Sequence, residues 1–184
     1  MESFFKEAIA SIQSSGTIRP SSRYLIRACL KDLVFSDAKT IIEFGTGDGC
    51  ITAEIVTKMS PKTNLYSFEI NPKFFAHCQN KFSLQKNTYI LNVSALDFDS
   101  VLKKDSINEV DYIISSLPLT LLKESEIDVL LNKVLRYLKK GGIFVQYQYS
   151  LGKYRRLKKI FDKVDVDLTI RNLPPAFIYK CYNK

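Results

Sequence analysis

Apolar runs alternate with amphipathic stretches along most of the chain. Seven runs rich in β-branched and aromatic residues predict strands at residues 40–44, 64–69, 88–92, 110–115, 142–149, 164–171 and 176–182. The clearest helical stripe between them consists of Ile127, Leu130, Leu131, Val134, Leu135 and Leu138. Lys139 and Lys140 would then lie in the last turn of this helix, and Gly141 would end it. This alternation is typical of an open α/β sheet.

The last two predicted strands are joined by residues 172–175, which read Asn-Leu-Pro-Pro. Proline cannot continue a helix, so this segment predicts a turn between two antiparallel strands. The first 36 residues stand apart from the alternating pattern. One helical face of this segment carries Phe4, Phe5, Ala8, Ile9 and Ile12. We expect a helical appendage over residues 1–36, which either caps the protein or lies on a membrane, and a single domain over residues 37–184.

Composition places the chain among ordinary globular proteins. Its 184 residues are 46% hydrophobic and 25% charged, which suits one domain. Four cysteines without CxxC spacing and a single histidine predict neither a zinc site nor a disulfide framework, so we expect no metal. No apolar run reaches the roughly 18 residues that span a membrane. The expected location is therefore cytoplasmic, in solution or peripheral on the inner face of the membrane.

Positive charge gathers towards the C-terminus. The net charge is +8, and residues 153–184 alone hold nine basic and three acidic side chains. Such a surface attracts anionic lipid headgroups, at about 1 kcal/mol per basic residue, or nucleic-acid phosphates. Composition does not choose between these partners, and a solvated basic face without a partner stays open.

The segment over residues 39–52 reads KTIIEFGTGDGCIT, in which an apolar strand leads into alternating glycines. Gly45, Gly47 and Gly49 can adopt positive φ and let a ligand lie against the backbone. Glu69 ends the next strand about 20 residues later, where a carboxylate can accept hydrogen bonds from ribose hydroxyls. The GxGxG spacing differs from the GxGxxG of dinucleotide enzymes. NAD binding and a turn without a ligand remain the alternatives.

Glu43, the three glycines and the acidic strand end resemble the class I S-adenosylmethionine-dependent methyltransferases. The resemblance implies a Rossmann-like α/β fold with a mostly parallel seven-stranded sheet, an antiparallel last strand and the strand order 3-2-1-4-5-7-6. Four further segments, at residues 16–25, 115–119, 144–150 and 172–179, resemble the bacterial phospholipid N-methyltransferases, which are relatives of the ribosomal RNA adenine dimethylases. That family methylates phosphatidylethanolamine and has an N-terminal amphipathic helix on the membrane.

The resemblance also implies which residues contact S-adenosylmethionine. The expected cofactor-binding residues are Ser21, Ser22, Glu43, Phe44, Gly45, Thr46, Gly47, Glu69, Ile70, Ser94 and Ala95. Ser94 stands where an acidic residue usually faces the adenine amine, so this chain departs from the family pattern there. Asp48 and Cys50 also replace small or apolar residues, and the sequence gives no reason for either.

Methyl transfer from a sulfonium to an amine is an in-line displacement, for which positioning matters more than acid–base chemistry. Ser115, at the end of the fourth predicted strand, is the expected catalytic residue that orients the amine. Enzymes that methylate base amines have an aromatic residue after the proline of this segment, and a flipped base stacks on it. Here Leu119 follows Pro118, which disfavours a nucleic-acid acceptor. A turn without a catalytic role is the alternative.

A phospholipid acceptor also needs phosphate donors beside the amine pocket. The candidates for substrate binding are Arg23, Tyr147, Tyr149, Arg155 and Arg156. The two tyrosines alternate along a strand, so packing against a helix explains them equally well. The first hypothesis is an N-methyltransferase that acts on a phospholipid amine at an anionic membrane surface. An RNA or protein amine methyltransferase and a non-catalytic module with this fold are the rivals.

Overall fold

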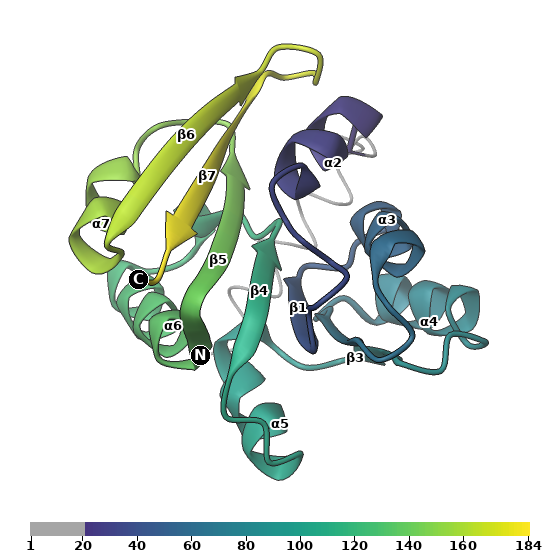
Figure 1. Cartoon of the computed structure of the whole chain (residues 1–184). Coiled ribbons are helices and arrows are strands. Elements are labelled where there is room, and N and C mark those ends of the chain that lie inside the picture. The colour runs from purple at the N-terminus through teal and green to yellow at the C-terminus, as the bar shows by residue number, and fades with distance from the viewer. Residues whose placement is uncertain (1–20) are drawn as a thin grey trace.

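The computed structural model describes residues 21–184, so the predicted helix with Phe4 and Phe5 lies outside the described residues. One seven-stranded sheet runs through the described chain in the order β3-β2-β1-β4-β5-β7-β6 (Figure 1). The strands are β1 Thr40–Phe44, β2 Asn64–Phe68, β3 Thr88–Leu91, β4 Val110–Ser115, β5 Leu138–Gln148, β6 Lys163–Thr169 and β7 Ala176–Tyr182. The first five strands are parallel, and β7 is antiparallel to both β5 and β6. The predicted fold, strand order and antiparallel pair are confirmed.

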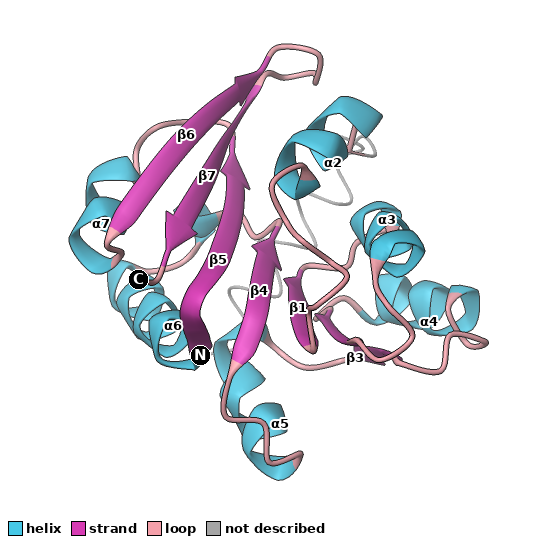
Figure 2. Ribbon diagram, viewed as in Figure 1, coloured by secondary structure: helices cyan, strands magenta, loops and turns pink. Residues whose placement is uncertain are grey.

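Helices cover both faces of this sheet (Figure 2). They are α2 Arg23–Leu30, α3 Cys50–Lys58, α4 Pro72–Lys81, α5 Phe98–Lys104, α6 Glu124–Tyr137 and α7 Tyr154–Ile160, with the 3₁₀ turns η1 Ala95–Asp97 and η2 Leu119–Leu121. One buried cluster joins the sheet to α5, α6 and α7, and contains Phe44, Phe98 and Phe144. A second cluster on the other face joins α2 and α3 to the sheet. The core therefore has two layers, one on each side of the strands.

Helix α2 contributes to the second cluster rather than standing away from the sheet. Leu25, Cys29 and Leu30 are buried there. Just beyond the helix, the Asp32 carboxylate pairs with Lys180 of β7, an ammonium group that also lies 3.0 Å from Asp167 of β6. The division of the chain at residue 36 stays a prediction.

The predicted stripe on α6 is confirmed at Ile127, Leu130, Leu131 and Val134, which are fully buried. The predicted end of this helix is wrong. Helix α6 ends at Tyr137, and β5 begins at Leu138 instead of residue 142.

The early start of β5 has a tertiary cause. Lys139 does not cap the helix, because its ammonium group pairs with the Asp111 carboxylate of β4. Asp111 also accepts hydrogen bonds from the backbone N–H groups of Lys39 and Thr40, at 2.8 and 2.9 Å. The β4–β5 register shifts just after this point, and Gly141, with a φ of 75°, lies within the bulge. An ion pair across the sheet therefore extends the strand where sequence periodicity continues the helix.

Candidate cofactor and acceptor site

The glycine turn lies where β1 ends, at the carboxyl edge of the parallel strands, where ligands bind in open α/β sheets. Gly45, Gly47 and Gly49 have φ angles of 81°, 55° and 77°, which favour glycine. A Cβ atom at Gly45 would come 2.4 Å from Ser116 Oγ, whereas one at Gly47 would meet no atom within 4 Å. The turn is therefore tightly held at Gly45 and open at Gly47, where a ligand can approach the backbone.

Glu43 lies beneath this turn in a network of hydroxyl groups. Its Oε2 accepts hydrogen bonds of 2.7 Å from Thr52 Oγ1 and from Ser67 Oγ. Thr46 Oγ1 lies 2.6 Å from the same Ser67 hydroxyl. Burial raises the pKa of Glu43 to about 7, although the two hydroxyl donors oppose the shift. Its Oε1 is buried without a hydrogen-bond partner among the described residues, so one acceptor remains for a donor on the ligand.

Glu69 extends from the end of β2 towards the glycine turn. Its Oε2 accepts a hydrogen bond of 2.8 Å from the Gly47 N–H, and its Oε1 accepts one of 2.7 Å from the Asn71 N–H. Burial raises the pKa of Glu69, and these N–H groups oppose that shift. Each carboxylate oxygen keeps a second lone pair, so both can accept from ribose hydroxyls. Phe44 is fully buried and Ile70 half-buried, and both pack in the first core cluster.

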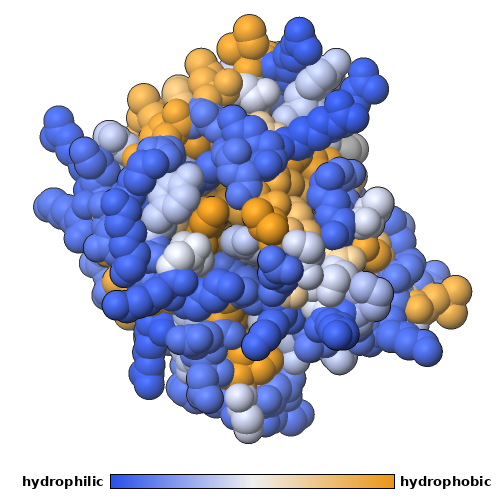
Figure 3. Space-filling view, viewed as in Figure 1, coloured by the Kyte–Doolittle hydropathy of each residue, from blue (hydrophilic) through white to orange (hydrophobic). Residues whose placement is uncertain are grey.

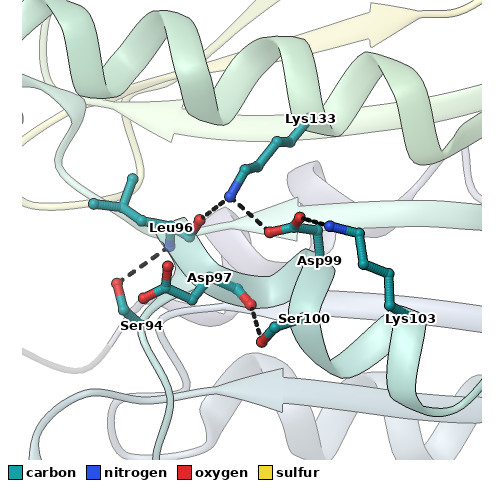
Figure 4. A network of polar contacts seen from close by, with 7 residues as sticks. All are labelled: Ser94, Leu96, Asp97, Asp99, Ser100, Lys103 and Lys133. Atoms are coloured by element: carbon teal, nitrogen blue, oxygen red, sulfur yellow. Dashed lines mark hydrogen bonds and ion pairs between the residues drawn. The ribbon is translucent and has the colours of Figure 1, made fainter.

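The loop after β3 is fixed by contacts that the sequence did not reveal. Ser94 caps η1, since its Oγ accepts a hydrogen bond of 3.2 Å from the Leu96 N–H (Figure 4). Asn92 Nδ2 donates to the Glu69 carbonyl at 2.8 Å and so ties the end of β3 to the end of β2. Ala95 is buried. The predicted adenine residues therefore lie on a loop attached to the Glu69 segment.

Helix α6 anchors this loop from the other side. Lys133 Nζ donates to the Leu96 carbonyl at 2.7 Å and to Asp99 Oδ1 at 2.6 Å, and Lys103 pairs with Asp99 Oδ2 at 2.7 Å. Figure 4 shows the Asp97 side chain directed towards the Ser94 side of η1. Asp97 is exposed, so an acidic group lies near the position at which Ser94 departs from the family pattern.

The structure gives Asp48 and Cys50 a local role. Asp48 Oδ1 accepts a hydrogen bond of 3.1 Å from the Cys50 N–H at the first turn of α3, and Asp48 Oδ2 accepts one of 3.0 Å from the Cys50 thiol. Lys81 Nζ donates to the Asp48 carbonyl at 3.0 Å. Asp48 thus satisfies a backbone donor at the start of the helix after the glycine turn.

At the end of β4, Ser115 is fully buried, and its Oγ accepts a hydrogen bond of 3.3 Å from the Leu117 N–H. Leu119 is also fully buried and packs in the first core cluster, so it offers no surface to a ligand. The neighbouring Ser116 Oγ donates to the Gly45 carbonyl at 2.7 Å. The role of Ser115 in orienting an amine stays a prediction, and Ser116 is the residue that joins this segment to the glycine turn.

Gln146 of β5 holds the same segment from the other side. Its Nε2 donates to the carbonyl groups of Ser115 and Leu117, at 3.3 and 3.0 Å. Its Oε1 is buried without a partner among the described residues, as is the amide nitrogen of Gln148. The sequence analysis named residues 144–150, which contain Gln146, only as part of a motif. No pattern in the sequence indicates where the side-chain amide of a glutamine points.

The N-terminal end of α2 meets the ends of β5 and β6. Ser22 caps α2 by accepting a hydrogen bond of 3.2 Å from the Leu25 N–H, and the Ser22 N–H donates to Asn172 Oδ1 at 3.2 Å. Ser21 Oγ lies 3.4 Å from the Tyr147 hydroxyl, and burial raises the pKa of that phenol. Tyr149 packs edge-on against Tyr147 at a centroid distance of 6.2 Å. The predicted serines and tyrosines are therefore brought together.

The predicted arginines are divided between the two faces of the sheet. Arg23 lies on α2, whereas Arg155 and Arg156 lie on α7 on the opposite face (Figure 1). Arg156 pairs with Glu124 and with Asp128 at 2.8 Å. Arg155 lines a pocket of about 560 Å³ between α6 and α7. Arg156 is thus engaged by two carboxylates, while Arg155 is exposed.

Within residues 21–184, no group of three or more His, Cys, Asp or Glu side chains is placed to hold a metal ion. In the same range, every helix is too short or too polar to span a bilayer.

Comparisons with known proteins agree with this geometry. The family model of the methyltransferase domain matches residues 35–171. The ornithine lipid N-methyltransferase of Singulisphaera acidiphila is 29% identical over 180 residues, which cover 97% of this chain and 91% of that protein. These likenesses reach well beyond the glycine turn.

Solved structures show the same fold. The precorrin-6y C5,15-methyltransferase of Geobacter metallireducens has a TM-score of 0.69 at 16% identity, covering 88% of this chain and 89% of that chain. The N-methyltransferase NodS of Bradyrhizobium japonicum has a TM-score of 0.69 at 13% identity, covering 88% and 95%. The 16S rRNA N2 G1207 methyltransferase of T. thermophilus, solved with AdoMet and guanosine, has a TM-score of 0.68 at 15% identity, covering 93% and 45%.

Proposed function

The chain belongs to the methyltransferase domain family and uses S-adenosylmethionine as methyl donor, and we propose that its acceptor is the amine of a lipid headgroup. The observation that carries this proposal is the likeness to the ornithine lipid N-methyltransferase over 97% of the chain. Matches to the solved structures concern the fold alone. Phosphatidylethanolamine and ornithine lipid share the required chemistry, which is a primary amine on an amphiphile.

The residues of the site fit this cofactor. The open backbone at Gly47 leaves room for the ligand, Glu69 offers lone pairs to the ribose hydroxyls, and Glu43 Oε1 is a buried acceptor without a partner. When bound, the cofactor supplies a methyl group on a positive sulfonium. The work of the chain is to hold the acceptor nitrogen in line with that group and to exclude water.

On the acceptor side, the amine must arrive neutral, because an ammonium has no lone pair. With the cofactor bound, the nitrogen would take the methyl group as the bond from that group to sulfur breaks, and it would then release a proton to solvent. We assign the orientation of the amine to the backbone carbonyls of the segment after β4, and to Ser115 as the buried residue whose hydroxyl binds the Leu117 N–H and holds that segment. Ser116 and Gln146 position that segment, since they bind the carbonyl groups of Gly45 and Leu117.

The buried state of Leu119 supports a lipid over a nucleic acid. A flipped base needs an aromatic platform, which contributes about 1–3 kcal/mol per base. The residue after Pro118 is an aliphatic side chain packed in the core. We further propose that the enzyme works at the inner surface of the membrane, with residues 1–36 as an appendage on the methyltransferase domain.

The test is methyl transfer with the full-length chain and isotopically labelled S-adenosylmethionine. Phosphatidylethanolamine, ornithine lipid, total RNA and a lysine-rich peptide are offered separately. We expect label in a lipid fraction and none in RNA, and Glu69→Ala should abolish most of it. Label found only in RNA or in the peptide would reverse the proposal.

A further inference from the structure

Four apolar side chains are exposed along β6 and its turn to β7. Val166 is 37% exposed, Leu168 56%, Ile170 75% and Leu173 70%. We call these four residues the hairpin patch. Figure 3 shows apolar surface gathered along the upper left of the molecule, where Figure 1 places β6 and its turn. The four residues lie within eight positions of the chain, unlike the single exposed leucines that are normal on protein surfaces.

The patch continues a buried row. Val164 precedes Val166 by one alternation of the strand, and it packs against the core cluster beneath α7. Exposure then rises along the same face towards the turn. Helix α7 therefore covers only the start of this row, and the rest projects beyond it.

Basic side chains lie beside the β6–β7 turn, on the side of the sheet that α2 covers. The guanidinium groups of Arg23 and Arg171 each lie 5.1 Å from the centroid of the Tyr24 ring. A hydrogen bond from Arg23, together with the charges of Arg23, Arg171 and Arg27, lowers the pKa of Tyr24. All three arginines are exposed, and none of them has an ion pair within residues 21–184. Residues 168–175 contain no Asp or Glu.

The turn lies at the same edge of the sheet as the site. Strands β5 and β6 both run antiparallel to β7, so β6 ends at the carboxyl edge of the parallel strands. The glycine turn and the end of β4 lie at this edge. Asn172, in the β6–β7 turn, accepts a hydrogen bond from Ser22, whose neighbour Ser21 contacts Tyr147. A partner surface that bound the β6–β7 turn would therefore face the opening of the cofactor and acceptor site.

We propose that the hairpin patch inserts into an anionic lipid surface and that Arg23, Arg27 and Arg171 bind its phosphates. Apolar side chains beneath the headgroups and cations at their level are the arrangement of proteins that lie on membranes. This inference rests on the proposed lipid substrate, because docking of the hairpin patch on a membrane would turn the acceptor site towards the headgroup layer. The partner is a bilayer surface, with its charge complementary to the three arginines.

The sequence contains no tryptophan, which allows a direct test. In the full-length protein, Leu173→Trp places a single fluorophore on the patch. Leu84→Trp is the matched control, since Leu84 is 91% exposed between α4 and β3. Strand β3 is the edge strand at the other side of the sheet from β6. With vesicles of phosphatidylglycerol and phosphatidylcholine, the first variant should show blue-shifted emission that brominated acyl chains quench. The control should show neither effect.

A second variant measures the contribution to binding. Ile170→Ser combined with Leu173→Ser changes exposed side chains, so the melting temperature should hold while partition to anionic vesicles weakens about tenfold or more. Unchanged partition, or no spectral shift while the protein still sediments with vesicles, would overturn the proposal. A shift that depends on protein concentration without lipid would assign the patch to a second copy and also overturn it.

Failure here differs from failure of the proposed function. If the patch docks as proposed, the double variant should still methylate lipid dispersed in detergent and lose activity only on vesicles. Absence of lipid methylation by the wild type in both forms would contradict the proposed function, whereas the fluorescence result does not require methyl transfer.

Discussion

The Glu69 carboxylate accepts a hydrogen bond of 2.8 Å from the Gly47 N–H, and this contact joins the end of β2 to the glycine turn. The group expected to bind the ribose is thus oriented by the same turn that leaves room for the ligand. Removing either member should disturb cofactor binding before it disturbs the fold, because both lie at the edge of the sheet.

Glu69→Ala should weaken binding of S-adenosylmethionine at least tenfold. Each hydrogen bond to a charged acceptor contributes about 1.5–3 kcal/mol, and the alanine leaves the ribose hydroxyls without their acceptor. Titration calorimetry measures the effect. Glu109→Ala, which removes an exposed carboxylate just before β4, is the control and should bind as the wild type does. Equal affinity in both variants would place the cofactor elsewhere.

Acidification should weaken cofactor binding by the wild type through the same residue. Burial raises the pKa of Glu69 above the usual value, so protonation reaches this carboxyl earlier as the pH falls. The protonated form is a poorer acceptor for hydroxyl groups. We expect affinity to be present above the raised pKa and to decline below it. Glu69→Ala should lack this pH dependence of cofactor affinity. Identical pH profiles for the two proteins would contradict the prediction.

Gly47→Ala should separate binding from stability. Its φ of 55° makes an alanine cost about 1–2 kcal/mol, but its Cβ would meet no protein atom within 4 Å. The methyl group instead fills space that we assign to the cofactor, so affinity should fall about tenfold or more. Gly141→Ala is closely matched, with a φ of 75° and equally open surroundings, but lies in the β5 bulge. Gly141→Ala should lower the stability of the fold and leave the affinity for the cofactor unchanged. Thermal melts measure the first quantity and calorimetry the second.

Local patterns were sufficient for most of the fold. The strands are short apolar runs bounded by turn residues, and their alternation with helices favours parallel pairing, whereas the strand order came from the resemblance to the class I methyltransferases. The glycine turn was predictable because glycine is the residue that most readily adopts positive φ. Three glycines at alternating positions therefore indicate a turn that needs this conformation. The place of Glu69 beside that turn was also predictable, since adjacent parallel strands end at the same edge of the sheet, and its contact with the cofactor stays a prediction.

Side-chain partners across the sheet could not be predicted. The start of β5 depends on the pairing of Lys139 with Asp111, which is a contact between distant segments. Leu119 was noted only for the absence of an aromatic residue after Pro118, and its burial depends on how η2 packs against the core. Ser116 and Gln146 bind carbonyl groups of neighbouring segments, and no spacing in the sequence signals such hydrogen bonds.

Glu43→Gln should change how stability depends on pH. Burial raises the pKa of Glu43 in the folded protein to about 7 from 4.5, so the folded state holds a proton that the unfolded state has lost in this window. Wild-type stability should therefore fall as the pH rises from 4.5 towards 7, by an amount on the order of 3 kcal/mol. The glutamine does not titrate and should lack this decline. Urea unfolding at both ends of the window measures it, and parallel curves for the two proteins would contradict it.

Ser115→Ala and Ser116→Ala should affect different steps. Ser116 donates to the Gly45 carbonyl at 2.7 Å, so its loss should weaken cofactor binding through the glycine turn. Ser115 makes no direct contact with that turn among the described hydrogen bonds, and its Oγ binds the Leu117 N–H within the acceptor segment. Its loss should therefore lower kcat more than it weakens binding of S-adenosylmethionine. Calorimetry, steady-state kinetics on dispersed lipid and thermal melts of both variants separate these effects. If Ser115→Ala keeps wild-type turnover, other groups orient the amine, and the case for a lipid acceptor rests on the relative alone.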